Sequence, residues 1–185
     1  GIRHAFRSHA EPEGGYPIRQ VCLYGIAECI RAEMVPRCLR AGDMKTFGRL
    51  MSISHDGDRV TKLVGGERVP VDKSYPEERI GALIDDLESG DADRVERASL
   101  WRQGGGYNVS LPEIDMLVDI ALATEGVVGA GLVGAGMGGC IVAVVEKEHA
   151  ARVIENMAEQ YYNPRGLPVK AEIVMPVGGL CTMDI

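Results

Sequence analysis

The sequence has few of the residues that would stabilise a disulfide-rich or metal-dependent protein. Its five cysteines are an odd number, are widely spread and form no C-x-x-C pair, so neither a disulfide framework nor a zinc site is predicted. Its four histidines form no H-E-x-x-H motif. We therefore expect reduced thiols, no metal site and a cytoplasmic location.

Long apolar runs and an excess of positive charge are also absent. No run approaches the roughly 18 apolar residues of a membrane-spanning helix, and no signal peptide is expected. The formal net charge of −7 argues against nucleic acid or an anionic membrane as a partner. Aromatic residues make up only 5% of the chain, so aliphatic side chains must form its core. The 185 residues predict one sizeable globular domain, or one domain with an appended piece.

Glycine is the residue in excess, at 24 of 185 positions against a usual share of roughly 7%. The densest stretch, residues 129–139, contains the G-x-G-x-x-G pattern twice. In a dinucleotide-binding fold this pattern opens a helix, but here six mainly apolar residues typical of a strand follow at 140–145. The chain also has no G-x-x-x-x-G-K-[ST] loop.

We therefore predict a strand, a glycine loop and a second strand. Glycines let a backbone approach a ligand closely and let successive N–H groups point into one concavity. The alternative is a tight turn that only relieves crowding in a packed sheet. We favour the functional loop because four glycines fall within six residues. These are Gly134, Gly136, Gly138 and Gly139.

The remaining patterns predict an α+β protein. Helices are expected over 18–39, where Pro36 should kink or end the helix, and from residue 44, with Asp43 as its N-cap. A third helix should start at a capping box of Ser110 and Glu113, and a fourth should cover 148–162. Strands are expected within 127–145, with 140–145 in a central position, and over 169–177. The α-β-β-α-β order predicts a ferredoxin-like two-layer sandwich, an antiparallel sheet with helices on one face.

Residues 56–109 show weaker patterns, and we interpret them as an insertion with one or two helices. Turns are predicted at 65–66 and at two prolines, and residues 104–106 are expected to form an exposed, flexible glycine loop. Acidic residues outside the glycine loop are predicted to be solvated surface charges, since their spacing follows no calcium-loop pattern. These are Asp85, Asp86, Glu88, Asp91 and Asp93, with Asp115 and Asp119 on the third helix.

Several segments together resemble the galactokinase branch of the GHMP small-molecule kinases. Residues 134–139, followed by Cys140, are similar to the third, C-terminal motif of that superfamily. The segments 110–115 and 47–55 resemble two further galactokinase stretches. Near the start, residues 2–4 and 16–19 resemble the region that joins the two lobes of these enzymes.

The resemblance implies a domain division and site roles. Residues 1–17 would be an interlobe segment, and 18–185 a GHMP kinase C-terminal domain that contains the 56–109 insertion. The family transfers a phosphoryl group from ATP to a sugar hydroxyl, with Mg²⁺, and galactose metabolism would be its setting. Tyr16 matches a tyrosine that contacts the sugar. Residues near the nucleotide phosphates would be Arg3, Gly134, Gly136, Gly138 and Gly139.

The family's serine-rich phosphate loop and catalytic aspartate lie upstream of the matching region and are not in this sequence. The chain opens on Gly1, where the first lobe would end. We therefore expect a C-terminal lobe without catalytic residues of its own, inactive alone, whose partners are a missing N-terminal lobe and a sugar. An alternative is a non-catalytic module of the same fold that binds a small molecule or a protein. A small ferredoxin-like regulatory domain would not explain Tyr16, Arg19 and the 47–51 segment together.

Overall fold

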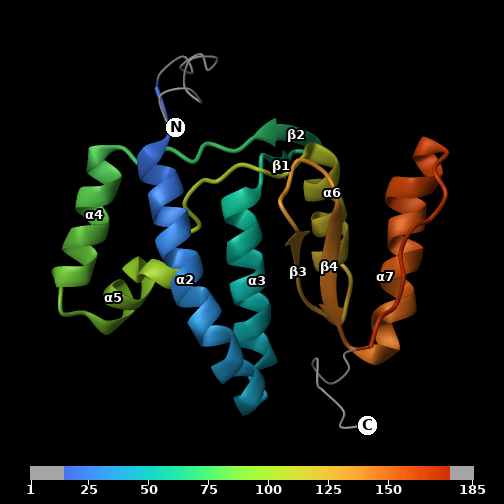
Figure 1. The fold of residues 1–185 in the computed structure, drawn as a ribbon, viewed down its shortest axis with the longest axis horizontal. Coiled ribbons are helices and arrows are strands. Elements are labelled where there is room, and N and C mark those ends of the chain that lie inside the picture. The colour runs from blue at the N-terminus through green and yellow to red at the C-terminus, as the bar shows by residue number, and fades with distance from the viewer. Residues whose placement is uncertain (1–14, 176–185) are drawn as a thin grey trace, which may run out of the picture.

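The computed structural model describes residues 15–175, in which helices are combined with two small antiparallel hairpins (Figure 1). The first part comprises α2 (Ile18–Ala41), α3 (Met44–Asp58), β1 (Thr61–Val64), β2 (Glu67–Pro70), α4 (Glu77–Glu88), α5 (Ala92–Ala98) and η2 (Leu100–Arg102). The second comprises α6 (Pro112–Leu122), β3 (Val127–Val133), β4 (Cys140–Val145), η3 (Lys147–His149), α7 (Ala150–Met157), the π-helical η4 (Ala158–Tyr162) and η5 (Asn163–Arg165). The predicted α+β class is confirmed. In the described part of the chain, no helix is both long and apolar enough to cross a bilayer.

The β3–β4 hairpin lies at the centre of the second part, between helices. Ala130 is fully buried on the face that packs against α6 and α7. The neighbouring Gly129 points the other way, toward α3, because successive strand residues alternate between faces. There a Cβ on Gly48 would lie 1.8 Å from the Val128 carbonyl oxygen, so α3 approaches β3 as closely as a glycine allows. Figure 1 shows α3 and α7 flanking the hairpin. The main core cluster is Leu117, Val118, Ile120, Ala121, Ala130, Val153 and Met157.

The corner between α2 and α3 follows its capping signals, with one exception. Gly42 ends α2 in the left-handed conformation (φ +68°), and the Asp43 side chain accepts a hydrogen bond from the Thr46 N–H at 3.0 Å, as predicted. Of the two effects predicted for Pro36, a kink or an end, the end is not found, because α2 continues to Ala41. Residues that the helix buries on both sides of the proline, Arg31 and Cys38, hold the last turns in place.

A second corner in the chain has the same local design. The sequence Leu-x-x-Gly-Asp occurs at 39–43 and again at 87–91, where Gly90 (φ +70°) follows α4 and the Asp91 side chain caps α5. The two corners differ in packing, because α3 lies against β3 whereas α4 buries none of its residues. At these two corners a glycine and an aspartate mark where the helices end and begin, whereas contact with β3 distinguishes α3 from the exposed α4.

The stretch predicted as an insertion leaves and returns to the fold at one place. The Tyr107 N–H donates to the Gly57 carbonyl at 2.8 Å, and the Ser110 N–H donates to the Asp58 carbonyl at 3.0 Å. Between these points lie the β1–β2 hairpin, which sequence patterns did not predict, and the helices α4 and α5. Since its two ends are bonded together, this stretch adds residues without separating α3 from α6.

The glycine run at 104–106 differs from its prediction as an exposed, flexible loop. Gly105 and Gly106 are buried against α2, and the Gly106 N–H donates to the Gln20 carbonyl at 3.0 Å. A Cβ on Gly105 would lie 2.4 Å from the Tyr24 nitrogen. The run consists of glycines because two backbones meet there, not because the chain needs to move.

The C-terminal region also departs from the predicted pattern. In the described part of the expected 169–177 strand, residues 169–175 form no strand. Instead the chain runs back along α7 (Figure 1). Its residues 170–174 line a cavity of about 380 Å³ together with residues of β4 and α7. Within residues 15–175, β4 pairs only with β3, so the central position predicted for it is not found. The cavity lies beside β4, where the predicted sheet would have a further strand.

Candidate functional site

The glycine loop that joins β3 to β4 has a backbone that other residues adopt only with strain. Gly134, Gly136, Gly138 and Gly139 have φ values of +96°, +83°, +126° and +98°. Met137, between them, has φ +59° and an 83% exposed side chain. The loop therefore presents backbone, with a single long side chain, at the surface.

One side of this loop is anchored and the other is open. The Met137 N–H donates to the Val109 carbonyl at 2.6 Å, and a Cβ on Gly136 would lie 2.5 Å from the Val109 Cβ. A Cβ on Gly134 or Gly138 would meet nothing within 4 Å. The two open glycines are thus required by backbone conformation and not by packing, which leaves their side of the loop accessible to a ligand.

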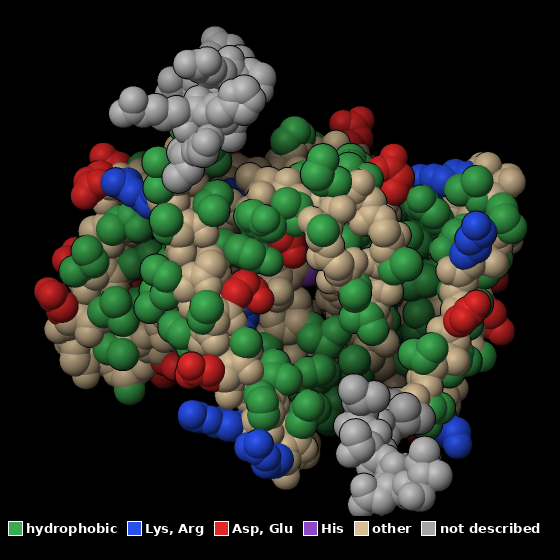
Figure 2. Space-filling view, viewed as in Figure 1, with side chains coloured by type: hydrophobic (Ala, Val, Ile, Leu, Met, Phe, Trp, Pro, Cys, Tyr) green, Lys and Arg blue, Asp and Glu red, His purple; other side chains and the backbone are tan. Residues whose placement is uncertain are grey.

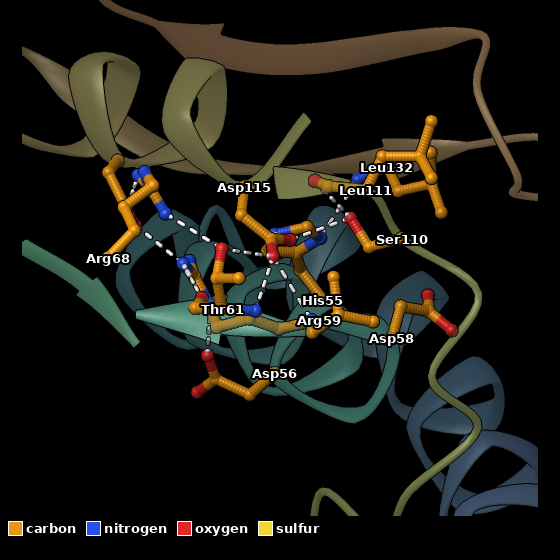
Figure 3. A network of polar contacts seen from close by, with 12 residues as sticks. His55, Asp56, Asp58, Arg59, Thr61, Arg68, Ser110, Leu111, Asp115 and Leu132 are labelled. Atoms are coloured by element: carbon orange, nitrogen blue, oxygen red, sulfur yellow. Dashed lines mark hydrogen bonds and ion pairs between the residues drawn. The ribbon is translucent and has the colours of Figure 1, made fainter. Parts of the chain in front are cut away.

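The base of the loop is held by a buried histidine. His55, at the end of α3, is 2% exposed, and its Nδ1 accepts a hydrogen bond from the Leu132 N–H at 3.3 Å (Figure 3). Because Nδ1 accepts, the proton of a neutral imidazole lies on Nε2. That nitrogen faces Asp115 Oδ1 at 3.4 Å. His55 therefore links the last part of β3 to α6.

Asp115 is the hub of the network in Figure 3, and it is fully buried. Its carboxylate accepts hydrogen bonds from the Ser110 hydroxyl at 2.6 Å, the Thr61 N–H at 2.7 Å and the Val60 N–H at 3.0 Å. Burial opposes ionisation, but His55 and these donors outweigh it and hold the pKa of Asp115 well below its usual range. The hub is therefore a carboxylate that fixes β1, α6 and His55 relative to one another.

The predicted capping box is wrong, and so is the surface position predicted for two aspartates. Leu111 is the N-cap of α6, while the Ser110 hydroxyl is used by Asp115. Asp119 binds Arg59 at 2.7 Å and also Arg68, so it fastens the β1–β2 hairpin to α6. Sequence spacing placed both aspartates on the outer face of the helix, but the hairpin covers that face.

Tyr16 lies just before α2 and lines a second pocket. Its side chain is 45% exposed, and the pocket measures about 340 Å³. The lining residues come from the start of α2 and from the segment between β2 and α4. They are Tyr16, Ile18, Arg19, Gln20, Ser74, Tyr75 and Pro76. Arg3, the other residue predicted near the lobe junction, is outside the described residues.

Backbone contacts connect the Tyr16 region to the glycine loop. Gly106 is bonded to Gln20 at the start of α2, and Val109 is bonded to Met137 in the loop. Residues 106–111 thus form a strip between the two, and all three segments lie at the upper end in Figure 1. No loop residue lines the Tyr16 pocket, so the structure places the predicted residues along one edge and not in one cavity.

The same edge carries exposed apolar side chains. Figure 2 shows apolar groups over much of this face, including its upper edge. Ile18 is 67% exposed at the start of α2, and Tyr107 is 48% exposed in the strip. Met137 and Val133 are exposed at the loop. Exposed apolar side chains gathered along one edge are typical of an interface with another domain.

Within the described residues, one cluster has the composition of a metal site. Potential ligand atoms of Glu146, Glu148 and His149 lie within 4.8 Å of one another on an exposed turn. The acidic residues of α4 and α5 act differently, since Asp86 pairs with Arg94 at 2.7 Å and Asp91 caps its helix. The described cysteines carry free thiols.

Sequence reasoning missed the role of His55. The sequence signal for His55 is the segment Ser54-His55 within the 47–55 stretch, which resembles galactokinases as a whole and singles out no residue. A lone histidine on a helix predicts nothing by itself, because its partners Leu132 and Asp115 are 77 and 60 positions away in the chain.

Comparisons with known proteins agree with the motifs. Residues 83–163 match the family model described as GHMP kinases C terminal, and the match begins in α4, inside the stretch predicted as an insertion. The chain is 30% identical over 162 residues to a galactokinase of Roseiflexus sp. (strain RS-1), which covers 88% of this chain and 29% of that relative. Galactokinases of Bos taurus and Homo sapiens are 31% and 29% identical over 74% of this chain.

The chain spans less than a third of the length of these relatives. The matches confirm the predicted resemblance to the galactokinase branch of the GHMP kinases.

Proposed function

We propose, on the premise that this chain is a galactokinase-like C-terminal lobe of the GHMP kinase type, that it forms part of an ATP-dependent sugar kinase. The reaction would transfer a phosphoryl group from ATP to a sugar hydroxyl, with galactose as the first candidate substrate. Residues 18–185 would form the lobe, residues 1–17 its connection to the catalytic lobe, and 56–109 an insertion. The cytoplasmic location stays a prediction.

The observation that carries the proposal is the edge formed by Tyr16, the strip 106–111 and the glycine loop. A phosphoryl-transfer site works mainly by positioning its groups and stabilising charge, so exposed and rigid backbone is useful there. The loop has that form, since its open glycines face solvent while the Met137 N–H anchors its middle and His55 holds the strand at its base. We assign Gly134, Gly136, Gly138 and Gly139 to the region beside the ATP phosphates and their Mg²⁺, together with Arg3.

We assign Tyr16 to sugar binding. Its pocket of about 340 Å³ is open to solvent, as expected of a sugar site that a second lobe must cover. The pocket and the loop lie at opposite ends of the strip, so the sugar hydroxyl and the γ-phosphate would have to meet between them when both ligands are bound. The second lobe would cover the apolar side chains of this edge and supply the catalytic residues.

We further propose that the chain alone does not phosphorylate sugars, because the serine-rich phosphate loop and the catalytic aspartate that the resemblance implies are not in this sequence. The test is ATP turnover with galactose, measured for the chain alone and after addition of an N-terminal lobe with a serine-rich phosphate loop. Turnover only in the mixture supports the proposal. Robust phosphorylation by the chain alone refutes its incompleteness, and no turnover in either case favours a non-catalytic module of the same fold.

A further inference from the structure

The pocket at Tyr16 has two walls of different origin. One wall is the start of α2, and the other is the segment Ser74, Tyr75 and Pro76 between β2 and α4. The second wall belongs to the stretch interpreted as an insertion, so it is a feature that this chain adds to its pocket. A ligand that contacts Tyr16 must also fit against this added wall.

The added wall is rigid. Tyr75 is only 5% exposed, its carbonyl accepts a hydrogen bond from Arg19 at 2.7 Å, and its hydroxyl accepts one from the Gly105 N–H at 3.3 Å. The Arg79 guanidinium lies 3.8 Å above the Tyr75 ring and donates to the Ser74 carbonyl at 2.9 Å. A wall fixed by four separate contacts can discriminate between ligands, because it does not adjust at low cost to a poor fit.

The charges around the wall are already balanced. Arg19 is paired with Glu77 at 2.9 Å, and Arg79 is engaged by the Tyr75 ring and the Ser74 carbonyl. The remaining lining consists of the Tyr16 and Tyr75 side chains, the Ser74 hydroxyl, which donates to Asp72 at 3.1 Å, an amide and aliphatic surfaces. Such a lining suits hydroxyl groups and the apolar face of a sugar ring, and offers an anion no uncompensated cation among the described lining residues.

We propose that Ser74, Tyr75 and Pro76 form the selectivity wall of the Tyr16 pocket, and that Glu77, by balancing Arg19, makes this pocket favour a neutral polyhydroxy ligand over an anionic one. The inference rests on the proposed function in so far as it takes this pocket to be the sugar pocket. The inserted stretch then determines which ligand the pocket accepts. It has no part in phosphoryl transfer.

The test uses galactose and galacturonate as neutral and anionic probes, with binding to the full chain followed by NMR. Glu77→Gln removes the charge that balances Arg19 but keeps the shape of the side chain. We expect it to reduce the preference for galactose over galacturonate by about fivefold, the ratio for an exposed ion pair. Glu78→Gln, in the same first turn of α4, should leave the preference unchanged. Equal effects of the two variants would overturn the charge argument.

A second variant tests the wall by size. Ser74→Phe places a ring in the pocket from an exposed position and should weaken binding of both probes at least tenfold while thermal unfolding stays as in the wild type. Unchanged binding would show that Ser74 is not part of the wall. If neither probe shifts the signals of Tyr16 or Ser74, the pocket takes no sugar and the inference is wrong, whatever the turnover assay shows. Selective binding without turnover in the two-lobe mixture would refute the proposed function alone.

Discussion

The chain has two dense glycine runs, one packed against a helix and the other exposed at the surface. At 104–106 the glycines are packed so tightly against α2 that a Cβ on Gly105 would lie 2.4 Å from the Tyr24 nitrogen. At 134–139 the glycines turn a hairpin, and Gly134 and Gly138 have open space around them. The first run serves packing, and the second leaves backbone exposed. Glycine density in a sequence therefore does not distinguish a packing site from a ligand site, whereas the surroundings of each Cα do.

The largest expected effect belongs to the packed run. Gly105→Ala should lower the free energy of unfolding by about 4 kcal/mol or more, because its Cβ would strike the backbone of α2, which cannot move aside. Urea denaturation measures the loss. Gly65→Ala is a matched control, since Gly65 has nearly the same φ (+60° against +63°) but nothing within 4 Å of its Cβ position. Equal losses for the two would mean that backbone strain, and not close approach, explains this run.

The second effect concerns the base of the exposed loop. His55→Ala should cost about 3 kcal/mol, since it leaves a cavity, removes the acceptor of the Leu132 N–H and deprives Asp115 of a neighbour. In this variant, hydrogen exchange should become faster than in the wild type at Leu132 and in the loop. It should stay unchanged at Gly106, whose N–H is bonded to α2. If exchange rises equally in both glycine runs, the two are not held independently.

The third effect is a pH dependence that arises beside the packed run. Lys73 lies against Gly106, and burial, opposed by Asp56, Asp58 and Asp115, lowers the pKa of Lys73 to about 8. The folded chain then binds fewer protons than the unfolded chain between about pH 8 and pH 10.5, so stability rises with pH in this window. The gain from pH 8 to pH 10 should be about 2 kcal/mol.

Denaturation at a series of pH values up to 10 measures this gain. The series ends there because the raised pKa of Tyr24, which burial and Asp58 cause, makes stability fall again at higher pH. Lys73→Met should flatten the curve. A wild-type curve that is already flat would contradict the burial of a charged Lys73.

The smallest expected loss of stability belongs to the exposed run. Gly138→Ala should cost only about 1 kcal/mol, because its φ of +126° strains an alanine but its Cβ would meet nothing within 4 Å. Thermal or urea unfolding checks this value. A loss as large as that of Gly105→Ala would erase the distinction between the two runs.

Local signals predicted much of the fold. The Asp43 cap, the strand–loop–strand order around 134–139 and the amphipathic helix after residue 147 depend on residues close in the chain, and each is found. The conformation of the four loop glycines was also predictable, because only glycine accepts such φ values freely.

What failed depends on contacts between distant residues. Asp115 looked like a surface charge because helical spacing cannot show that His55 and Thr61 will cover it. Gly105 looked flexible because the sequence does not show Tyr24 passing 2.4 Å away from its Cβ position. The role of Tyr16 depends likewise on Ser74 and Pro76, which approach it only in the folded chain.

The central claim is that the exposed glycine loop lies beside the ATP phosphates in a two-lobe sugar kinase. The most direct measurement is galactose phosphorylation by a mixture of an N-terminal lobe with either the wild-type chain or Gly138→Ala. We predict turnover with the wild type and a loss of at least tenfold with the variant, although the variant stays folded. Equal turnover with both, or phosphorylation by the chain without the second lobe, would contradict the claim.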